Sequence, residues 1–416
     1  MAKCSNMDVR PFEVRITEEV LDDLRERLAR TRWPDEVADA GWEQGTNLAY
    51  MQELVEYWES SFDWREQEQS LNRFAHFRAE VDGFDLHFVH ERGKGPKPLP
   101  LILTHGWPST FFEFSKIVPL LTDPESHGGD PADAFDVVVP SLPGYGFSDS
   151  PTEEGFSWRI PELWVRLMEE LGYPRFAAHG VDVGASVANL LGLHYPDRLV
   201  GIHVTYPAEP YVGPGAPELS GREREFLKGR PRGQEAEGAY THIQRTKPLT
   251  LSYALNDSPT GLAAWIVEKF RAWSDCDGDV ERRFSKDELL TNLTIYWATE
   301  TIGSSFRVYR DWALGAESNP YAWEGREEVP RGVASKPLAR NERIEVPSAV
   351  ALFPADPPAG MPREWAERSY SDLRRFTRMP RGGHFPAMEE TELLAEDISA
   401  FLRPLRWQPY VEPSTG

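Results

Sequence analysis

Residues 178–186, AHGVDVGAS, place an aspartate where a sharp strand-to-helix turn would expose a nucleophile. Such a turn leaves no room for bulk two positions either side of its central residue, and Gly180 and Gly184 occupy those positions. A serine at the centre would need a base, whereas a carboxylate with a reference pKa of about 3.9 is already ionised at neutral pH. Asp182 is therefore the candidate nucleophile, although the pattern also describes an ordinary turn whose aspartate caps the helix.

A second aspartate and a histidine follow in the order that a nucleophile–acid–histidine triad requires. Asp356 directly follows the strand-like run SAVALF, and His384 lies in MPRGGHFPAMEE between the last strand pattern and the last helix pattern. The chain has ten histidines, and any one of them is more often packed or exposed than catalytic. The order Asp182, Asp356, His384 nevertheless predicts a triad, because each residue follows a strand pattern.

A third element, His105-Gly106-Trp107-Pro108, ends the strand-like run PLPLILT. A turn at this place can aim the backbone N–H of Trp107 toward the aspartate, where the N–H of Val183 would be a second donor. As an isolated tetrapeptide it could equally be a rigid turn. Its position on the first predicted parallel strand favours an oxyanion hole formed by Trp107 and Val183.

Five short apolar runs predict the sheet that would position these residues: 97–106, 134–144, 175–180, 199–207 and 348–353. Helical patterns separate them, and this rhythm is typical of a mostly parallel α/β sheet with crossover helices. Between about residues 215 and 335 the rhythm is lost, and runs such as SPTGLAAWIVEKFRAW indicate an inserted helical unit. The charged run 221–238, GREREFLKGRPRGQEAEG, is expected to be a solvated loop at its entrance.

The first 95 residues read as a helix-rich extension. Thr17 is a suitable N-cap for a helix that Trp33-Pro34 would end, a second helical pattern covers 48–64, and Asp82-Gly83 joins two alternating runs as a hairpin turn. The expected organisation is an N-terminal extension (1–95), a first core half (96–214), a helical insertion (215–335) and a second core half (336–416).

Composition excludes several classes of function. With 67 acidic and 45 basic residues the net charge is -22, which repels nucleic acid and anionic membrane surfaces. The two cysteines, Cys4 and Cys276, support neither a disulfide framework nor a thiolate metal site. No signal-peptide pattern or long apolar run is seen, so we expect a soluble, cytoplasmic protein without a membrane anchor. The oligomeric state is open, with a homodimer as one option.

Taken together, these motifs resemble the microsomal-type epoxide hydrolases, a family with the α/β-hydrolase fold. The likeness covers nearly the whole chain: WEQGT, ELVEYW and FDWREQEQSLNRF resemble the N-terminal meander of that family, followed by HGWPST, PSLPGYGFSDSP, THIQRTKPLTLSYALNDSPTGLAAWIVEKF, LLTNLTIYW and RGGHFPAMEE. The resemblance implies an α/β-hydrolase core with a helical lid inserted into it.

By this resemblance Asp182 is the nucleophile, Asp356 the acid and His384 the base. The lid would supply two tyrosines, Tyr240 before THIQ and Tyr309 in FRVYRDW. Two departures from the family pattern are present. The residue after the nucleophile is Val183 where relatives commonly have Trp, and the acid is Asp356 where relatives often use Glu.

The shorter Asp356 leaves an alternative partner for His384, namely Glu209 in YPAEP, just after the strand-like run 199–207. The expected reaction is attack of Asp182 on an epoxide carbon, proton donation by the two tyrosines, and hydrolysis of the resulting ester by water that His384 activates. A vicinal diol is released. This chemistry requires a small-molecule epoxide and water, and neither a metal ion nor an organic cofactor.

Two alternatives stay open on the residues. A haloalkane dehalogenase would use the same aspartyl ester, but Val183 provides no indole N–H for the halide. A non-catalytic ligand-binding protein of the same fold would have no need to keep the complete set Asp182, Asp356 and His384. A serine esterase is not favoured, because the chain has no GxSxG.

Overall fold

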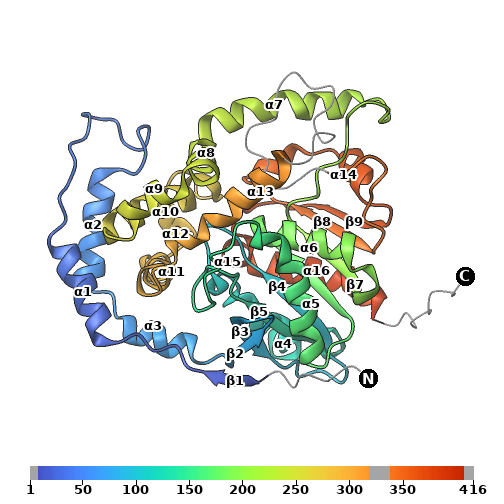
Figure 1. Ribbon diagram of the computed structural model, residues 1–416, viewed down its shortest axis with the longest axis horizontal. Coiled ribbons are helices and arrows are strands. Elements are labelled where there is room, and N and C mark those ends of the chain that lie inside the picture. The colour runs from blue at the N-terminus through green and yellow to red at the C-terminus, as the bar shows by residue number, and fades with distance from the viewer. Residues whose placement is uncertain (1–7, 318–337, 407–416) are drawn as a thin grey trace, which may run out of the picture.

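The computed structural model describes residues 8–317 and 338–406 (Figure 1). Their strands form one nine-stranded sheet in the order β1-β2-β3-β5-β4-β6-β7-β8-β9. The strands are β1 (Val9–Phe12), β2 (His76–Val81), β3 (Phe84–Glu91), β4 (Leu99–Thr104), β5 (Phe135–Pro140), β6 (Phe176–Gly180), β7 (Leu199–Val204), β8 (Ser348–Leu352) and β9 (Leu373–Arg378). Strands β4 to β9 pair in parallel, as expected, and β1, β2 and β3 add an antiparallel edge.

Both faces of the parallel part of the sheet are buried, as the apolar runs predict. Successive residues of β4 alternate between two hydrophobic clusters: Leu101 and Leu103 belong to one, and Ile102 belongs to the other. Helices α4 (Ile117–Thr122) and α16 (Thr391–Leu402) contribute to the first cluster, and α5 (Ile160–Glu170) and α6 (Asp182–His194) contribute to the second. Short helices α14 (Arg363–Ser369) and α15 (Pro386–Glu389) complete the core.

The N-terminal extension adds strands as well as helices. The predicted hairpin is confirmed: Val81 pairs with Phe84, and Asp82 and Gly83 both have positive φ, 53° and 79°. The single helix expected over 48–64 is two helices, α2 (Leu48–Ser60) and α3 (Trp64–Leu71). The chain breaks between them because the Asp63 carboxylate caps a new helix, accepting from the backbone N–H of Arg65 at 2.8 Å.

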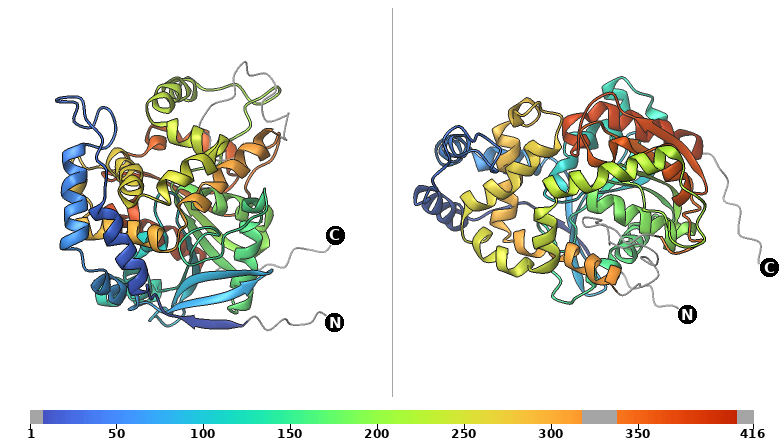
Figure 2. Two further views of the ribbon diagram at one scale, coloured as in Figure 1. Left: turned by 60° about the vertical axis from the view of Figure 1, so that its left-hand side comes forward. Right: turned by 90° about the horizontal axis from the view of Figure 1, so that it is seen from above.

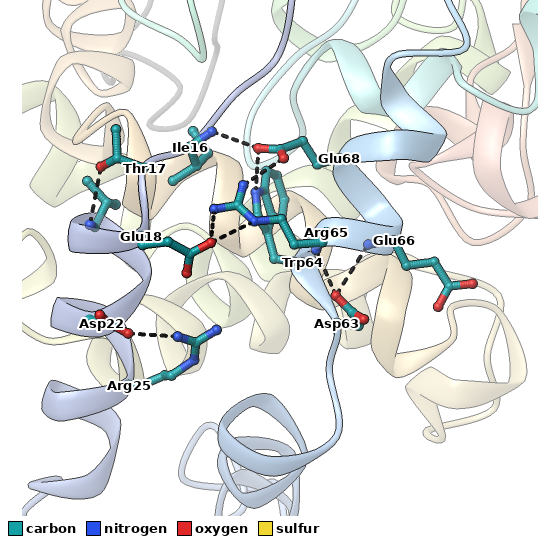
Figure 3. A network of polar contacts seen from close by, with 11 residues as sticks. Ile16, Thr17, Glu18, Asp22, Arg25, Asp63, Trp64, Arg65, Glu66 and Glu68 are labelled. Atoms are coloured by element: carbon teal, nitrogen blue, oxygen red, sulfur yellow. Dashed lines mark hydrogen bonds and ion pairs between the residues drawn. The ribbon is translucent and has the colours of Figure 1, made fainter.

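A carboxylate on α3 fastens the start of the extension (Figure 3). Glu68 accepts hydrogen bonds from the Ile16 backbone N–H at 2.7 Å and from the Trp64 indole N–H at 3.0 Å. Arg65 pairs with the same carboxylate at 2.6 Å and with Glu18 of α1 (Glu18–Ala29) at 2.5 Å. This network fixes the N-terminal end of α1 on α3, and α1 then extends toward the inserted helices.

The insertion between β7 and β8 forms a helical lid whose described helices are α7 (Gly221–Glu237), α8 (Ala239–Thr246), α9 (Pro248–Leu255), α10 (Pro259–Trp273), α11 (Lys286–Ala298), α12 (Ile302–Ser305) and α13 (Arg307–Glu317). Helices α1 and α2 pack against α10 and α11, and the blue and yellow-to-orange ribbons lie side by side in Figures 1 and 2. The extension therefore supports the lid as well as the sheet.

The expected solvated loop over 221–238 is wrong, because residues 221–237 form helix α7. Its start carries a capping box: the Glu223 N–H donates to the Ser220 hydroxyl at 3.1 Å, and the Ser220 N–H donates to the Glu223 carboxylate at 2.6 Å. Glu223 also pairs with Arg368 of α14 and is only 1% exposed. The pattern S-x-x-E at residues 220–223 indicates a helix start, but the high charge of the segment led to the prediction of a loop.

Among the described residues, no helix is both long and apolar enough to cross a bilayer. Cys276 is buried and has no disulfide partner, while Cys4 lies outside the described residues. The ends of three expected units, 1–95, 215–335 and 336–416, also extend beyond the described ranges, and the bounds of the four units stay predictions.

Candidate active site

Asp182 lies at the junction of β6 and α6, where the chain turns sharply. Its φ of 46° is in the left-handed region, which non-glycine residues seldom adopt outside constrained turns. The flanking glycines are required by space: a Cβ at Gly180 would lie 2.0 Å from the Gly184 carbonyl oxygen, and one at Gly184 would lie 1.8 Å from that of Thr104. The local pattern therefore forces the Asp182 side chain outward from the sheet.

Two backbone N–H groups hold the Asp182 carboxylate. The Trp107 N–H donates to Oδ1 at 2.9 Å, and the Val183 N–H is the second donor. A Cβ at Gly106 would lie 2.4 Å from Asp182 Oδ1, so only glycine permits this approach. Burial raises the pKa of Asp182, while the nearby His384 and the two N–H donors oppose that rise by favouring the ionised form. The structure thus brings the expected oxyanion-hole donors together around Asp182.

His384 lies between the two aspartates. Its Nδ1 is 2.8 Å from Asp356 Oδ1, and its Nε2 is 3.6 Å from Asp182 Oδ2 without a hydrogen-bond partner among the described residues. Burial by itself lowers the pKa of His384, but the charges of both aspartates and the hydrogen bond with Asp356 outweigh it and raise that pKa to about 9. The ring is therefore an imidazolium at neutral pH while Asp182 is charged.

Glu209, the alternative partner for His384, is engaged elsewhere. Its carboxylate makes a bidentate ion pair with Arg230 of α7, at 2.8 and 3.0 Å. Asp356 is thus the carboxylate in contact with His384, and Glu209 links the core to the lid.

Two lid tyrosines surround Trp107 above the aspartate. The ring of Tyr240 from α8 stacks on Trp107 with centroids 5.1 Å apart, and the ring of Tyr309 from α13 meets it edge-on at 6.2 Å. Burial, followed by the charge of Asp182, raises the pKa of both phenols, so both remain protonated. The Tyr309 hydroxyl is buried, and its side chain interacts with that of Tyr240.

A cavity of about 1290 Å³ opens onto these groups. Its inner wall includes Asp182, Asp356, His384, Tyr240 and Trp273, and its outer part runs beneath α7 toward α14 and β9. The outer wall is polar, with Arg222, Glu225, Arg230, Arg363, Glu364 and Arg378. Tyr309 does not line it and is only 3% exposed, since it lies behind the ring of Tyr240.

The residues that hold the Trp107 loop in place were not predicted from the sequence. From α11, the Asn292 amide donates to the Pro108 carbonyl at 2.9 Å, and the Tyr296 hydroxyl donates to the Ser109 carbonyl at 2.9 Å. Thr110 in turn donates to the Asn292 side-chain oxygen at 3.0 Å. Polar residues inside the buried run LLTNLTIYW were the available signal, because buried polar groups are usually hydrogen-bonded. The lid thereby sets the position of the Trp107 N–H, one of the two expected oxyanion-hole donors.

Comparisons with known proteins agree along the chain. The family described as "Epoxide hydrolase N terminus" matches residues 9–114, and the family described as "alpha/beta hydrolase fold" matches residues 100–300. Epoxide hydrolase 1 of Sus scrofa is 37% identical, with 98% of this chain and 91% of that protein covered. Juvenile hormone epoxide hydrolase 2 of Ctenocephalides felis is 35% identical, with 94% and 84% covered.

Solved structures give the same relationship at the level of the fold. The structure of the Aspergillus niger epoxide hydrolase is similar with a TM-score of 0.79 and 28% identity, covering 96% of this chain and 97% of that one. The juvenile hormone epoxide hydrolase of the silkworm Bombyx mori is similar with a TM-score of 0.77 and 27% identity, covering 96% and 94%.

Proposed function

The chain belongs to the microsomal-type epoxide hydrolase family and is an epoxide hydrolase, and from this premise we propose that it opens its substrate through a covalent ester on Asp182. The observation that carries the proposal is the position of the Asp182 carboxylate. It lies between two backbone N–H donors on one side and the unpartnered Nε2 of His384 on the other. A diol is the product, and water is the second substrate.

In the first half-reaction the Asp182 carboxylate attacks one epoxide carbon. The C–O bond of the ring breaks toward oxygen, and the oxygen takes a proton from Tyr240 or Tyr309 as its charge develops. The raised pKa of each phenol keeps the proton available. The product of this step is an ester between the substrate carbon and Asp182, with the new hydroxyl on the adjacent carbon.

Formation of the ester then converts His384 into a base. The carboxylate of Asp182 is one of the charges that raise the pKa of His384, and esterification removes it. His384 can now give up its proton, which restores the tyrosine that donated in the first half-reaction, and the Nε2 lone pair faces the side of the ester where water must arrive. Asp356 keeps Nδ1 protonated and the ring oriented, since it accepts at 2.8 Å.

In the second half-reaction water attacks the ester carbon of Asp182 and transfers its proton to His384 Nε2. The negative charge that develops on the former carboxylate oxygen is stabilised by the N–H groups of Trp107 and Val183. Collapse of the tetrahedral intermediate breaks the bond between the Asp182 carbonyl carbon and the ester oxygen. That oxygen leaves in the diol and takes up the remaining proton of the attacking water, which restores the Asp182 carboxylate. The two donors already contact Asp182 in the resting site, which supports this role.

Dehalogenation is the less supported reaction at this site. A halide leaves without a proton, so its departure does not require the two protonated tyrosines beside the nucleophile. In addition, Val183 has no indole N–H that could bind the halide. The tyrosines favour a leaving oxygen that must be protonated.

A single turnover in ¹⁸O-labelled water tests the ester mechanism. We expect mass spectrometry of the peptide that contains Asp182 to show label in its carboxylate, because water attacks the ester carbonyl carbon. Label found only in the diol, with Asp182 unlabelled, would contradict the proposal. The double variant Tyr240→Phe, Tyr309→Phe should not form the ester, and normal turnover by that variant would exclude the proposed acid role.

Partners and location extend the proposal. We propose a small-molecule epoxide as the substrate, with no nucleic acid partner at a net charge of -22, and a cytoplasmic enzyme with a homodimer as one option. Cell fractionation and light scattering after size-exclusion chromatography test the location and the oligomeric state.

A further inference from the structure

The loop that carries Trp107 contains a buried carboxyl group for which the proposed reaction has no use. Glu113 lies in the short helix η1 (Phe111–Phe114), is 1% exposed, and its Oε1 has no hydrogen-bond partner among the described residues. An ionised carboxylate so placed would be costly. Burial raises the pKa of Glu113 to about 8, against the opposing effects of Ser109 and His384. Glu113 is therefore a neutral carboxylic acid at pH 7.

Ser109 connects this acid to the backbone of the oxyanion loop. Its hydroxyl oxygen is hydrogen-bonded to Glu113 Oε2 and lies 3.0 Å from the carbonyl oxygen of Gly106. A hydroxyl group has one proton to donate. Because the Gly106 carbonyl can only accept, Ser109 donates to that carbonyl and accepts the proton of the Glu113 acid.

The Gly106 carbonyl belongs to the peptide group whose N–H is that of Trp107. A peptide group is planar, so fixing its C=O fixes the direction of the N–H that reaches Asp182 at 2.9 Å. His105 is the second donor, since its Nε2 accepts from the Leu142 N–H and its Nδ1, 3.1 Å from the Gly106 carbonyl, must carry the proton. Two donors on the C=O also polarise the peptide toward stronger N–H donation.

We propose that Glu113 is a positioning residue that acts through Ser109 on the Gly106–Trp107 peptide, and that it does so only in its protonated form. The proposal rests on the proposed function, because that peptide matters only if Asp182 passes through an ester with a developing oxyanion. When Glu113 ionises, it becomes an acceptor, and the Ser109 proton turns from the Gly106 carbonyl toward it. The Gly106 carbonyl then loses one of its two hydrogen-bond donors, and the direction of the Trp107 N–H is less firmly fixed.

Other titratable groups face Glu113, and their effects on the pH profile must be distinguished from its own. His384 lowers its pKa, and Asp182 and Glu389 of α15 raise it. Tyr296 of α11 is in electrostatic contact and stays protonated, because burial raises its pKa well above the usual value. Loss of the His384 proton makes ester hydrolysis faster as pH rises. A decrease in the hydrolysis rate above about pH 8 is therefore the signature of Glu113.

The experiment measures ester formation and ester hydrolysis separately, by rapid quenching and intact-protein mass spectrometry between pH 6 and 9.5. The variants Glu113→Gln and Glu113→Leu are matched, because both lack the charge and only Gln can donate to Ser109. We expect Glu113→Gln to hydrolyse the ester about 10-fold faster than Glu113→Leu at pH 7, the factor expected for one hydrogen bond. Ser109→Ala should resemble Glu113→Leu.

The pH profile distinguishes alignment from simple packing. We expect the wild-type hydrolysis rate to fall above pH 8, whereas Glu113→Gln keeps its rate at pH 9.5, and ester formation changes less than about threefold in every variant. Equal hydrolysis rates for Gln and Leu, or an alkaline decrease that persists in Glu113→Gln, would overturn the proposal. If the wild-type enzyme forms no ester at all, the proposed function fails, and that result is distinct from failure of the Glu113 role.

Discussion

The described residues include two buried histidine–aspartate pairs with nearly equal N···O distances, and only one of them has the surroundings of a catalytic base. His384 contacts Asp356 at 2.8 Å, and His203 on β7 contacts Asp397 of α16 at 2.9 Å. The difference lies in the second ring nitrogen. That of His384 has no partner and faces Asp182, whereas Nδ1 of His203 is 2.9 Å from Nδ1 of His179 on β6.

The proton positions of the second pair follow from its partners. His203 donates from Nε2 to the Asp397 carboxylate, so in its neutral form Nδ1 is an acceptor and receives the Nδ1 proton of His179. Asp397 further accepts from Arg375 at 2.7 Å and from Thr377 at 2.8 Å. Both ring nitrogens of His203 thus have partners within the core, and the pair joins β6, β7, β9 and α16. A free nitrogen beside a nucleophile, and not the pair itself, makes a catalytic base.

The largest effect should come from replacing each histidine by glutamine, whose amide nitrogen can take the place of Nε2. His384→Gln should lower ester hydrolysis by about 10³-fold or more and accumulate the ester, since the base is lost while Asp182 still attacks. His203→Gln should retain the wild-type rate per folded molecule. Rapid-quench mass spectrometry measures the ester. Ester accumulation in His203→Gln, or none in His384→Gln, would reverse the two roles.

Replacing the two aspartate partners, Asp356 and Asp397, should distinguish the two pairs in the same way, with smaller effects. Asp356→Asn should lower ester hydrolysis by about 10²- to 10³-fold, because the amide no longer stabilises the imidazolium or its tautomer. Asp397→Asn should instead lower the free energy of unfolding by about 3 kcal/mol, since Arg375 and His203 lose a buried charge partner. Urea titration and single-turnover rates measure the two quantities. A catalytic defect in Asp397→Asn at equal folded fraction would contradict the structural assignment.

The residues of the proposed active site could be selected from the sequence because each is tied to a strand end. The glycines around Asp182, the turn after β4 and the order of Asp356 and His384 are local features, and their packing follows from steric exclusion at Gly180, Gly184 and Gly106. Fold class follows from the same apolar rhythm, and the two clusters on the faces of the sheet confirm it.

The supporting residues could not be predicted, since their roles depend on contacts between distant segments. Asn292 and Asn189 are both buried asparagines, yet only the first holds the Trp107 loop, because α11 happens to lie against it. Likewise, His203 lies within a strand pattern, and nothing in its neighbours along the chain shows that His179 occupies its second nitrogen. Glu113 was overlooked for the same reason.

The smallest effect in this comparison concerns acid stability. Burial lowers the pKa of His179 well below its usual value, so the folded protein resists a proton that the unfolded chain accepts below about pH 6.5. A depressed pKa means that the full stability is present above that value and is lost as pH falls. The His179→Asn variant keeps a donor in the position of Nδ1 and does not titrate. Between pH 7.5 and 5.5, its free energy of unfolding should fall by about 1 kcal/mol less than that of the wild type.

Asp397 acts in the same direction at a lower pH. Burial opposes its ionisation, but the hydrogen bond and charge of His203, with Arg375 and Thr377, hold the pKa of Asp397 well below its usual value. Its contribution is thus complete above about pH 4 and is lost in stronger acid. The difference between wild type and His179→Asn should therefore develop above pH 5, where Asp397 does not titrate. An equal slope for both proteins in that window would show that His179 takes up its proton in the folded state, and would contradict the neutral form that its burial favours.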